Sequence, residues 1–525
     1  MRAAHTVEAV RSAEHALMAT VPDGALMQRA AAGVAATCAR LLDHVYGSRV
    51  LVLAGSGDNG GDALYAGARL ASRGADVIAV AAGQQLHPGG AAELRGRGGR
   101  VITAAAAPAS QAGRAAGGTA AGGTAAGGTA APQITDSAAR AIGGADLILD
   151  GLTGIGGRGG LREPAASLAR LTAGARADGA LVVAVDLPSG IDADTGETPG
   201  TAIKADVTVT FGTIKPGLLV DPGASHAGTV ELIDIGLGSY LADPAAIALQ
   251  AADVAAILPR PDAESDKYRR GVLGLLAGSE QYTGALVLAC GGAIRAGAGM
   301  VRAVSAAPAI GLVRQYWPEV VPTTYDPARP AEAVTAAGRV QAWAAGPGMG
   351  TGAAAHDLLA RVLASDVPVL VDADGLTVLA AHRDLLPRGA PTLITPHAGE
   401  LARLLGADRA DIEARRLHFA RTAAAELGVT VLLKGSTTVI ARPDGTLPIL
   451  VNATGSSWLA TAGSGDVLSG LAGGLLAQGA DAAHAAAAAA YLHGIAARLA
   501  AREAPIGASD LIGAIPAAIR TVKDL

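Results

Sequence analysis

The feature that most constrains the fold is a pattern of strand, loop, helix and strand that begins near residue 49. Residues 50–54 are continuously apolar, residues 55–62 form the glycine-rich loop GSGDNGGD, residues 63–73 have helical character, and residues 76–80 predict a second strand. Two strands joined through a helix run parallel, with a right-handed crossover. Parallel sheets are buried between layers of helices. The pattern therefore predicts an α/β fold with a doubly wound parallel sheet.

The same alternation continues along the rest of the chain. Its 525 residues suggest two or three domains at about 100–200 residues each. A boundary near residue 245, before the polar, proline-bearing stretch 258–270, predicts an N-terminal domain of residues 1–245 and a C-terminal domain of residues 246–525. Further strands are predicted at residues 146–149, 181–185, 207–211, 272–277, 340–345, 367–371, 392–395 and 429–433, and helices at 285–295, 399–405 and from 465 onward.

One segment departs from this alternation. From residue 104 to residue 132 the chain consists mainly of Ala, Gly and Thr, and it includes the repeat GGTAAGGTAAGGTA at residues 117–130. Such a segment cannot bury enough apolar surface to offset its chain entropy. We therefore expect a disordered surface insertion without chemistry.

The overall composition narrows the class of protein. Lys plus Arg (41) and Asp plus Glu (46) give a formal net charge of −5, which does not favour a nucleic acid or an anionic membrane as partner. Cys38 and Cys290 are the only cysteines, and they predict small buried side chains rather than disulfides or a zinc site. The most apolar late stretch, residues 485–501, is mainly alanine and contains His493 and Arg498, which disfavours a membrane span. A cytoplasmic protein is the expectation.

The glycine-rich loop of the first half predicts a nucleotide contact. Gly55, Gly57 and Gly60 have the G-x-G-x-x-G spacing of dinucleotide-binding sites. The second strand, however, runs into Ala-Ala-Gly at residues 81–83, without the acidic residue that would hold a ribose, so ordinary hydride transfer is disfavoured. Backbone N–H groups of such a loop still approach a phosphate or ribose closely at a helix N-terminus.

Two further strand ends of the first half carry acidic residues. Asp150 and Asp186 each follow a predicted strand and precede a glycine-rich turn. Because the C-terminal ends of parallel strands gather at one edge of the sheet, Asn59, Asp150, Asp186 and Ser189 are predicted to converge on a ligand. The alternative is that Asp150 and Asp186 only cap the turns that follow them. Asp186 is the candidate acid or base, since a carboxyl group in a partly desolvated cleft can exchange protons near neutral pH.

The most distinctive motif is NATGSSWLATAGSGDVLSG in the second half. A glycine-rich loop there is predicted to enter a helix at Asp466, so the N–H groups of Gly463, Ser464 and Gly465 can form an anion hole. A carboxylate at this point can accept a proton from a substrate hydroxyl, as phosphoryl transfer requires. The alternative is that Asp466 only caps the helix. The sequence has no G-x-x-x-x-G-K-[ST] motif, which excludes a Walker-type NTPase.

Two more residues of the second half lie at predicted strand ends. Lys434, in LLKGSTT, is a candidate phosphate contact or else a solvated lysine. His397 stands with Glu400 at a strand-to-helix corner on the same sheet edge. It is either a substrate contact or a structural turn residue.

The motifs of the first half resemble the NAD(P)H-hydrate epimerases of the YjeF N-terminal type. The resemblance rests on DNGGDALYAGARL, DGLTGIG, VDLPSGIDADTG and TVTFGTIKPG. It implies a Rossmann-like fold and a potassium ion held by the oxygen donors Asn59, Asp150 and Ser189. The family usually has Asn where this chain has Asp58, which changes the charge beside the ligand. The residues implied to bind the hydrated nicotinamide nucleotide are Asp58, Asn59, Gly60, Gly61, Asp62, Gly154, Ile155, Gly156, Gly157, Arg158, Gly159, Gly160 and Asp186.

The motifs of the second half are similar to the ribokinase-like, ADP/ATP-dependent NAD(P)H-hydrate dehydratases. They are GSEQYTGA, GPG, DADGL, TPHAGE, LKGSTT and LATAGSGDVLSG, in this order. The resemblance implies that Asp466 deprotonates the hydroxyl of the hydrate, that a phosphoryl group is transferred to that oxygen, and that phosphate then leaves with help from the ring nitrogen. Magnesium would offset the charge of the nucleotide. The implied contacts are Ala285, Gly348, His397 and Asp466 for the hydrated nucleotide, and Lys434, Gly435, Ser436, Thr437, Thr438 and Gly465 for ADP or ATP.

Together the two resemblances imply a bifunctional repair enzyme, an isomerase joined to a lyase. The first domain would equilibrate the R and S epimers of NADHX and NADPHX, and the second would dehydrate the S epimer, releasing phosphate and AMP from ADP or ADP from ATP. Its partners would be these small molecules and further copies of the chain in a homo-oligomer. The alternative is a ribokinase-like vitamin or sugar kinase, of the hydroxymethylpyrimidine type, with a non-catalytic metabolite-binding N-terminal domain.

Overall fold

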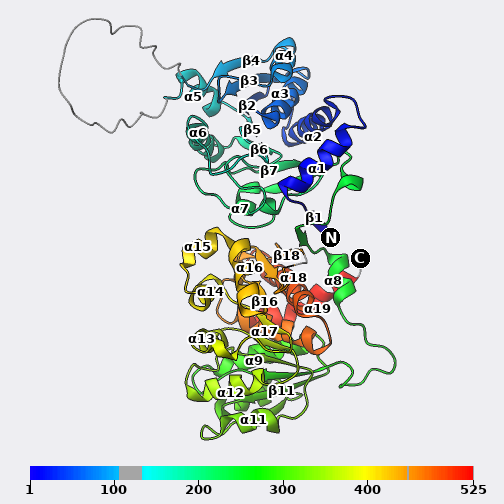
Figure 1. Cartoon of the computed structure of the whole chain (residues 1–525), viewed down its shortest axis with the longest axis vertical. Coiled ribbons are helices and arrows are strands. Elements are labelled where there is room, and N and C mark those ends of the chain that lie inside the picture. Colours follow the sequence, from blue (N-terminus) through cyan, green and yellow to red (C-terminus); the bar gives the residue numbers. More distant parts are fainter. Residues whose placement is uncertain (106–132, 446–447, 524–525) are drawn as a thin grey trace, which may run out of the picture. The chain divides into compact units, whose positions relative to one another are not determined.

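The computed structural model describes residues 1–105, 133–445 and 448–523 of the chain (Figure 1). Most of the predicted insertion, residues 106–132, lies outside the described residues. The chain divides into two compact units, of which each has its own sheet.

The N-terminal unit comprises His5–Leu218 and Pro222–Asp243, and the C-terminal unit comprises Met1–Ala4, Leu219–Asp221 and Pro244–Leu525. The break after Asp243 is close to the boundary predicted near residue 245. The first four residues differ from the prediction, because they form a strand of the C-terminal sheet.

The N-terminal unit is built on a seven-stranded sheet in the order β4-β3-β2-β5-β6-β7-β8, in which every pairing is parallel. This confirms the predicted doubly wound α/β fold. The strand order reverses between β2 and β5, and the loops after these two strands therefore diverge to leave a crevice for a ligand. The strands are β2 (Arg49–Ala54), β3 (Asp76–Ala81), β4 (Arg100–Thr103), β5 (Leu147–Gly151), β6 (Leu181–Val185), β7 (Val207–Phe211) and β8 (Thr229–Ile233).

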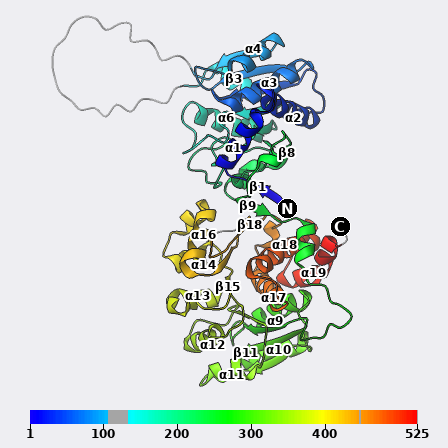
Figure 2. The same cartoon turned by 45° about the vertical axis from the view of Figure 1, so that its right-hand side comes forward.

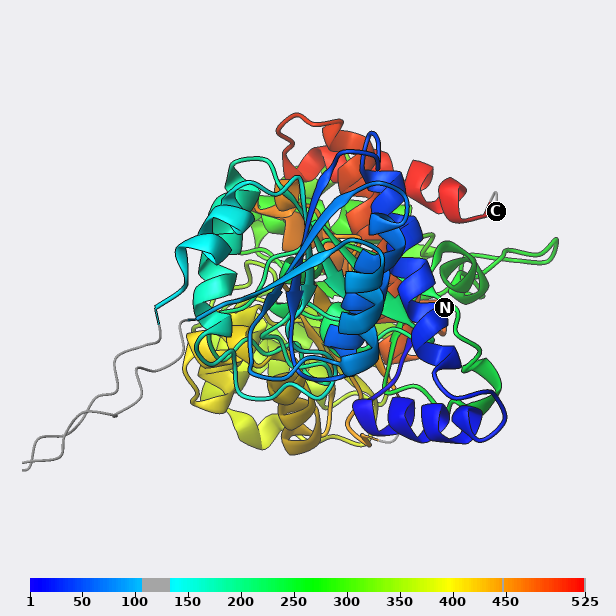
Figure 3. The same ribbon diagram turned by 90° about the horizontal axis from the view of Figure 1, so that it is seen from above.

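Helices cover both faces of this sheet, as burial of parallel strands requires. One apolar core lies under α1 to α4, and a second core lies under α5 and α6. Seen from above, α5 and α6 lie on the opposite side of the strands from α2 to α4 (Figure 3). The helices are α1 (Val7–Met18), α2 (Ala25–Leu41), α3 (Asp58–Ala71), α4 (Pro88–Gly96), α5 (Asp136–Gly143), α6 (Ala165–Ala177) and α7 (Gly223–Ala227).

The C-terminal unit is built on an eleven-stranded mixed sheet in the order β1-β9-β18-β17-β16-β15-β14-β13-β10-β11-β12. The part from β16 to β12 is parallel, whereas β17 runs antiparallel to β16 and to β18. The strands are β1 (Arg2–Ala4), β9 (Ala246–Ala248), β10 (Val272–Leu276), β11 (Met300–Ser305), β12 (Val321–Thr324), β13 (Ala342–Ala345), β14 (Val369–Val371), β15 (Thr392–Ile394), β16 (Thr430–Leu433), β17 (Thr438–Ala441) and β18 (Ile449–Asn452).

Helices rich in small residues pack tightly on this sheet. On one face α9, α17, α18 and α19 share an apolar core of Ala, Leu and Ile, while α12 and α13 lie on the other side (Figure 2). Ala, Leu, Ile and Val make up nearly all of the buried residues of this core. The helices are α8 (Ala251–Ile257), α9 (Thr283–Arg295), α10 (Ala307–Tyr316), α11 (Pro330–Ala336), α12 (Ala353–Leu363), α13 (Asp374–Ala381), α14 (Ala398–Leu405), α15 (Arg409–Ala414), α16 (Arg416–Leu427), α17 (Ser464–Ala477), α18 (Ala482–Ala501) and α19 (Ala508–Lys523).

Candidate active sites

The glycine-rich loop of the N-terminal unit connects β2 to α3 at the crevice of the sheet. Gly57 precedes α3, which begins at Asp58 and so turns its free N–H groups toward the crevice. A Cβ atom added at Gly55 would lie 2.0 Å from the carbonyl oxygen of Leu152, and one added at Gly60 would lie 2.2 Å from the carbonyl oxygen of Gly55. The loop can therefore cross the end of β5 only because these positions are glycine.

Of the four residues predicted to converge, Asn59, Asp150 and Ser189 share hydrogen-bonding partners in the structure, whereas Asp186 is not part of this set. Asp150 is fully buried, and its Oδ1 accepts a hydrogen bond from the Ser189 hydroxyl at 2.6 Å while its Oδ2 accepts one from the Ser189 N–H at 2.7 Å. Ser189 Oγ in turn accepts the Thr153 N–H at 2.9 Å, and the Asn59 amide donates to the Thr153 carbonyl at 3.1 Å. Burial raises the pKa of Asp150 to about 6.

Asp186 lies at the end of β6, in a left-handed backbone conformation with φ 64° that is uncommon for a residue with a side chain. Its Oδ1 accepts from the ammonium group of Lys215 at 2.5 Å, from the Thr210 hydroxyl at 3.1 Å and from the Phe211 N–H at 3.3 Å. Lys215 is 1% exposed and also donates to Thr210 and to the Phe211 carbonyl. The pair holds the Asp186 carboxylate in a fixed orientation and gives it a positive neighbour.

The remaining predicted residues of this half divide between two cavities. Gly157 to Gly160 line a cavity of about 330 Å³ together with Gly55 and Gly190. Asp58 and Asp62 line a second cavity, of about 370 Å³, against α1 and α2. Gly154 lies directly beside Asn59, because a Cβ added at Gly154 would be 3.0 Å from that of Asn59. Ile155 and Gly156 line a third, small space with Arg11 and Asp194, and Gly157 and Arg158 line both this space and the first cavity.

In the C-terminal unit, α17 begins at Ser464, two residues before Asp466, where the loop was predicted to enter the helix. Asp466 therefore lies inside the first turn, and Gly463, with φ 85°, takes the position before the helix. The explanation of Asp466 as a helix cap is thus wrong. Burial, reinforced by the carboxylate of Asp372, raises the pKa of Asp466 to about 7, which is close to the ideal for a general base at neutral pH.

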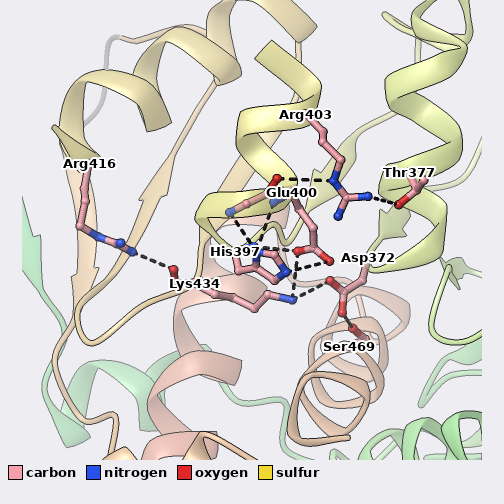
Figure 4. A network of polar contacts seen from close by, with 9 residues as sticks. Asp372, Thr377, His397, Glu400, Arg403, Arg416, Lys434 and Ser469 are labelled. Carbon is pink, nitrogen blue, oxygen red and sulfur yellow. Dashed lines mark hydrogen bonds and ion pairs between the residues drawn. The ribbon is translucent and has the colours of Figure 1, made fainter. Parts of the chain in front are cut away.

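A buried ion-pair network lies beneath this turn (Figure 4). The ammonium group of Lys434 is 2.8 Å from Asp372 Oδ1 and 3.8 Å from Glu400 Oε2, and Ser469 donates to Asp372 Oδ2 at 2.6 Å. Although burial by itself would lower it, these carboxylates raise the pKa of Lys434 above its usual value. A Cβ at Gly465 would lie 3.7 Å from Lys434 Nζ, so the charged pair stands against the glycine turn.

His397 precedes α14, where Glu400 closes a reciprocal cap. His397 Nδ1 accepts the N–H groups of Gly399 and Glu400 at 3.0 and 3.2 Å, and the Glu400 carboxylate accepts the His397 N–H at 2.8 Å. Burial lowers the pKa of His397. Because Nδ1 accepts two N–H groups, the neutral ring carries its proton on Nε2, which lies 3.7 Å from Glu400 Oε1 on a half-exposed side chain.

The loop after β16 contains the residues predicted to hold the nucleotide. Arg416 is buried beneath it and donates from Nη2 to the carbonyls of Lys434 at 2.8 Å and Thr437 at 3.2 Å. A Cβ at Gly435 would lie 2.2 Å from Arg416 Nη2, so a larger residue there would displace the guanidinium group from its present position. Ser436 and Thr437 also hydrogen bond to Asp221, which packs in this unit, and Thr438 begins β17.

Ala285 and Gly348 come together although 63 residues separate them in sequence. A Cβ added at Gly348 would lie 2.8 Å from that of Ala285. Ala285 is in the first turn of α9 and Gly348 follows β13, so both stand at the carboxyl edge of the sheet. This is the edge at which α/β folds bind ligands.

Sequence reasoning missed several side chains that organise these sites. Lys215 lies in the TVTFGTIKPG motif, but neither it nor Glu14 was singled out, because their proximity to Asp186 depends on elements far from it in sequence. Asp372 was visible in the DADGL motif, but its pairing with Lys434 and Ser469 depends on three elements far apart in sequence. Arg416 gave no signal, because it lies in an ordinary polar helix.

Comparison with known proteins identifies the family. The family model described as YjeF-related protein N-terminus matches residues 23–217, and the model described as NAD(P)H-hydrate dehydratase matches residues 273–517. A bifunctional NAD(P)H-hydrate repair enzyme of Mycobacterium leprae is 45% identical over 530 residues, covering 99% of each chain. The chain belongs to the bifunctional NAD(P)H-hydrate repair enzymes. The family and the enzyme class predicted from the motifs are confirmed.

A further curated relative agrees with this grouping, and a solved structure is similar to part of the chain. A bifunctional NAD(P)H-hydrate repair enzyme of Mycobacterium tuberculosis is 45% identical over 493 residues, covering 93% of this chain and 92% of its own. The structure of an ADP/ATP-dependent NAD(P)H-hydrate dehydratase from Bacillus subtilis, co-crystallised with ATP/Mg2+, is 33% identical, covers 52% of this chain and 97% of its own, and has a TM-score of 0.47.

Within the described residues, every helix is too short or too polar to cross a bilayer.

Proposed function

We propose that this chain repairs hydrated nicotinamide nucleotides in two steps. The N-terminal unit interconverts the R and S epimers of NADHX and NADPHX, and the C-terminal unit dehydrates the S epimer to NADH or NADPH with ADP or ATP as phosphoryl donor. The observation that carries the proposal is Asp466, a carboxyl group with a pKa of about 7 in the first turn of a glycine-led helix, in a chain of this family. A homo-oligomer in the cytoplasm is part of the same proposal.

The dehydration step follows from the chemistry of the C-terminal site. Hydroxide is a poor leaving group, whereas phosphate is a good one. Asp466 takes the proton of the substrate hydroxyl, and the oxygen then accepts the terminal phosphoryl group of the nucleotide bound at Lys434–Thr438 and Gly465. The N–H groups at the start of α17 stabilise the negative charge of that phosphoryl group during transfer. His397 Nε2, with Ala285 and Gly348, contacts the hydrated nucleotide.

Magnesium is expected to accompany the nucleotide. The carboxylates near the glycine turn, Asp466 with Asp374 beside it, are oxygen ligands of the kind that magnesium prefers. When bound, the ion offsets the charge of the phosphates. Asp372 is less suited to this role, because Lys434 and Ser469 already hydrogen bond to its two oxygens.

A potassium ion fits the N-terminal site. Asp150 is a fully buried carboxyl group, and the partners that the structure gives it, the Ser189 hydroxyl and N–H and the Leu152 N–H, are all neutral. A bound monovalent cation supplies the missing positive charge, and the amide oxygen of Asn59 and the Ser189 hydroxyl complete a set of oxygen donors. The role of this ion is to fix the loops that hold the substrate.

The test is the recovery of reduced nicotinamide absorbance from a mixture of NADHX epimers with ADP or ATP. Complete recovery at an enzyme-accelerated rate supports both activities. A fast phase that stops at the S fraction overturns the epimerase assignment alone. Absence of recovery overturns the repair function and favours a kinase of the same superfamily, which phosphorylation of hydroxymethylpyrimidine would then reveal.

A further inference from the structure

The cavity against α1 and α2 has an unusual lining. Its walls include the apolar side chains of Met18, Met27 and Phe211. Four carboxyl groups, Glu14, Asp23, Asp58 and Asp62, line the same cavity of about 370 Å³. Tyr65 and His87 also line it, with their ring centroids 5.8 Å apart. Methionine and aromatic side chains suit a flat ring, while the carboxyl groups suit a ring that is or becomes positively charged.

Asp62 is the unexplained member of this lining. It lies in the second turn of α3 and is 9% exposed, and its Oδ1 has no hydrogen-bond partner among the described residues. Burial, together with the carboxylates of Asp186, Asp58 and Glu14, raises the pKa of Asp62 well above its usual range. A buried carboxyl oxygen without a hydrogen-bond partner destabilises the folded protein. Such a group therefore usually has a function, such as binding a ligand or taking part in a reaction.

In the part of the chain that the structure describes, the charged side chains around Asp62 do not include a cation that pairs with its carboxyl group. Two cations act on Glu14 of this lining, Lys215 and Arg11. Lys215 is committed to Asp186, Thr210 and the Phe211 carbonyl, and Arg11 lines a separate space with Ile155 and Gly156. Burial raises the pKa of Glu14 as well, and the Asp186 carboxylate adds to this effect. His87 uses its Nδ1 to accept the Gly90 N–H and so caps α4.

Resting on the repair function proposed above, we propose that Asp62 is the acid and base of the epimerase reaction, and that the hydrated ring binds in the cavity that it lines. The substrate carbon carries both a hydroxyl group and the ring nitrogen. Protonated Asp62 gives its proton to that hydroxyl, the C–O bond breaks with its electron pair going to the oxygen, and water is released. The lone pair of the ring nitrogen forms a C=N double bond, which leaves a planar, positively charged ring.

The second half of the reaction restores every group. Water adds to either face of the planar carbon, the C=N electron pair returns to the nitrogen, and the water proton passes to the Asp62 carboxylate. The positive ring is stabilised by Asp58, Glu14 and the paired Asp186, which are carboxyl groups in or beside the cavity. Asp186, which the sequence suggested as the acid or base, is held by Lys215 through its Oδ1, so it is not free to exchange the substrate proton there.

Oxygen exchange tests this assignment without nucleotide, so that the dehydratase step is silent. Purified R-NADHX is incubated with the full chain in H2(18)O, and the R-to-S ratio and the isotope content of the product are followed by chromatography and mass spectrometry. For the unaltered chain we expect one solvent oxygen in each S product. Asp62→Asn keeps the shape of the side chain but cannot give a proton. In this variant we expect the rate of R-to-S conversion and the rate of solvent-oxygen incorporation each to fall by about 10²–10⁴-fold relative to the unaltered chain.

The pH profile separates a proton-transfer role from a structural one. The unaltered chain loses epimerase activity as pH rises through the raised pKa of Asp62, because the acid form disappears. In Asp62→Glu we expect the same loss of activity with rising pH, at a lower overall rate. In Asp62→Asn we expect the residual activity not to show this loss. Glu93→Gln removes an exposed carboxylate that pairs with Arg97 on the same unit and serves as the matched control.

Three results would overturn the assignment. The first is epimerisation by the unaltered chain with retention of the original oxygen, since the C–O bond then stays intact. The second is a rate for Asp62→Asn within about tenfold of the unaltered rate, below the loss expected for an acid–base group. The third is an R-to-S ratio that changes only at the uncatalysed rate in the unaltered chain, which refutes the proposed epimerase function itself.

Discussion

Replacing Asp466 by Asn is expected to abolish dehydration and, at the same time, to stabilise the C-terminal unit. The activity should fall by about 10²–10⁴-fold, because Asn cannot take the substrate proton. The stability gain follows from the raised pKa, which goes from an ordinary value of 3.8 to about 7 in the folded chain. Ionised Asp466 therefore lowers the free energy of unfolding, and its replacement by a neutral side chain of the same shape removes this destabilisation.

The size and pH range of this gain follow from proton linkage. A tenfold change in proton affinity is worth about 1.4 kcal/mol, so a carboxyl group with this pKa costs the fold at most about 4 kcal/mol when it is ionised. Because the folded pKa is the higher one, the cost is absent below about pH 4, grows as pH rises, and is complete above about pH 7. The advantage of Asp466→Asn should therefore be large at about pH 8 and small at about pH 5.

Tryptophan fluorescence during urea unfolding measures this effect in the right part of the molecule. The three tryptophans of the chain, Trp317, Trp343 and Trp458, all belong to the C-terminal unit, so the signal follows that unit alone. Glu264→Gln, which removes a side chain that is 86% exposed, is the control and should show no pH-dependent gain. A variant Asp466→Asn that is destabilised at about pH 8, or that gains equally at both pH values, would refute the reasoning.

Three further outcomes follow from the geometry. Lys215→Met should lower the free energy of unfolding of the N-terminal unit by about 3–5 kcal/mol, because Asp186 keeps a buried charge without its partner; circular dichroism at increasing urea measures this. Ser189→Ala should raise the potassium concentration needed for half-maximal epimerisation, whereas an unchanged potassium response would remove this residue from the site. Gly435→Ala should raise KM for ADP or ATP more than KM for NADHX, since the added methyl group meets Arg416, and equal effects on both would contradict the nucleotide assignment.

The sequence by itself determined the fold class and the position of each ligand loop. The apolar strand, glycine loop and helix at residues 50–73 predict a parallel sheet because backbone geometry permits few other connections. Asp150 and Asp186 could be placed at one sheet edge from their order alone, since parallel strands end on the same side. The motifs around Asp466 likewise indicated the family that the relatives confirm.

Only the tertiary structure decided which carboxyl groups are ionised and which are fixed by hydrogen bonds or ion pairs. Asp62, Asp150 and Asp186 look alike in sequence, yet one has an unpartnered buried oxygen, one is surrounded by neutral donors, and one is paired with Lys215. Similarly, Lys434 lies beside Asp372 because β16 and β14 are brought together by the order of the strands. The protonation state of a carboxyl group depends on burial and on neighbours across the sheet, and neither can be read from the residues beside it in the chain.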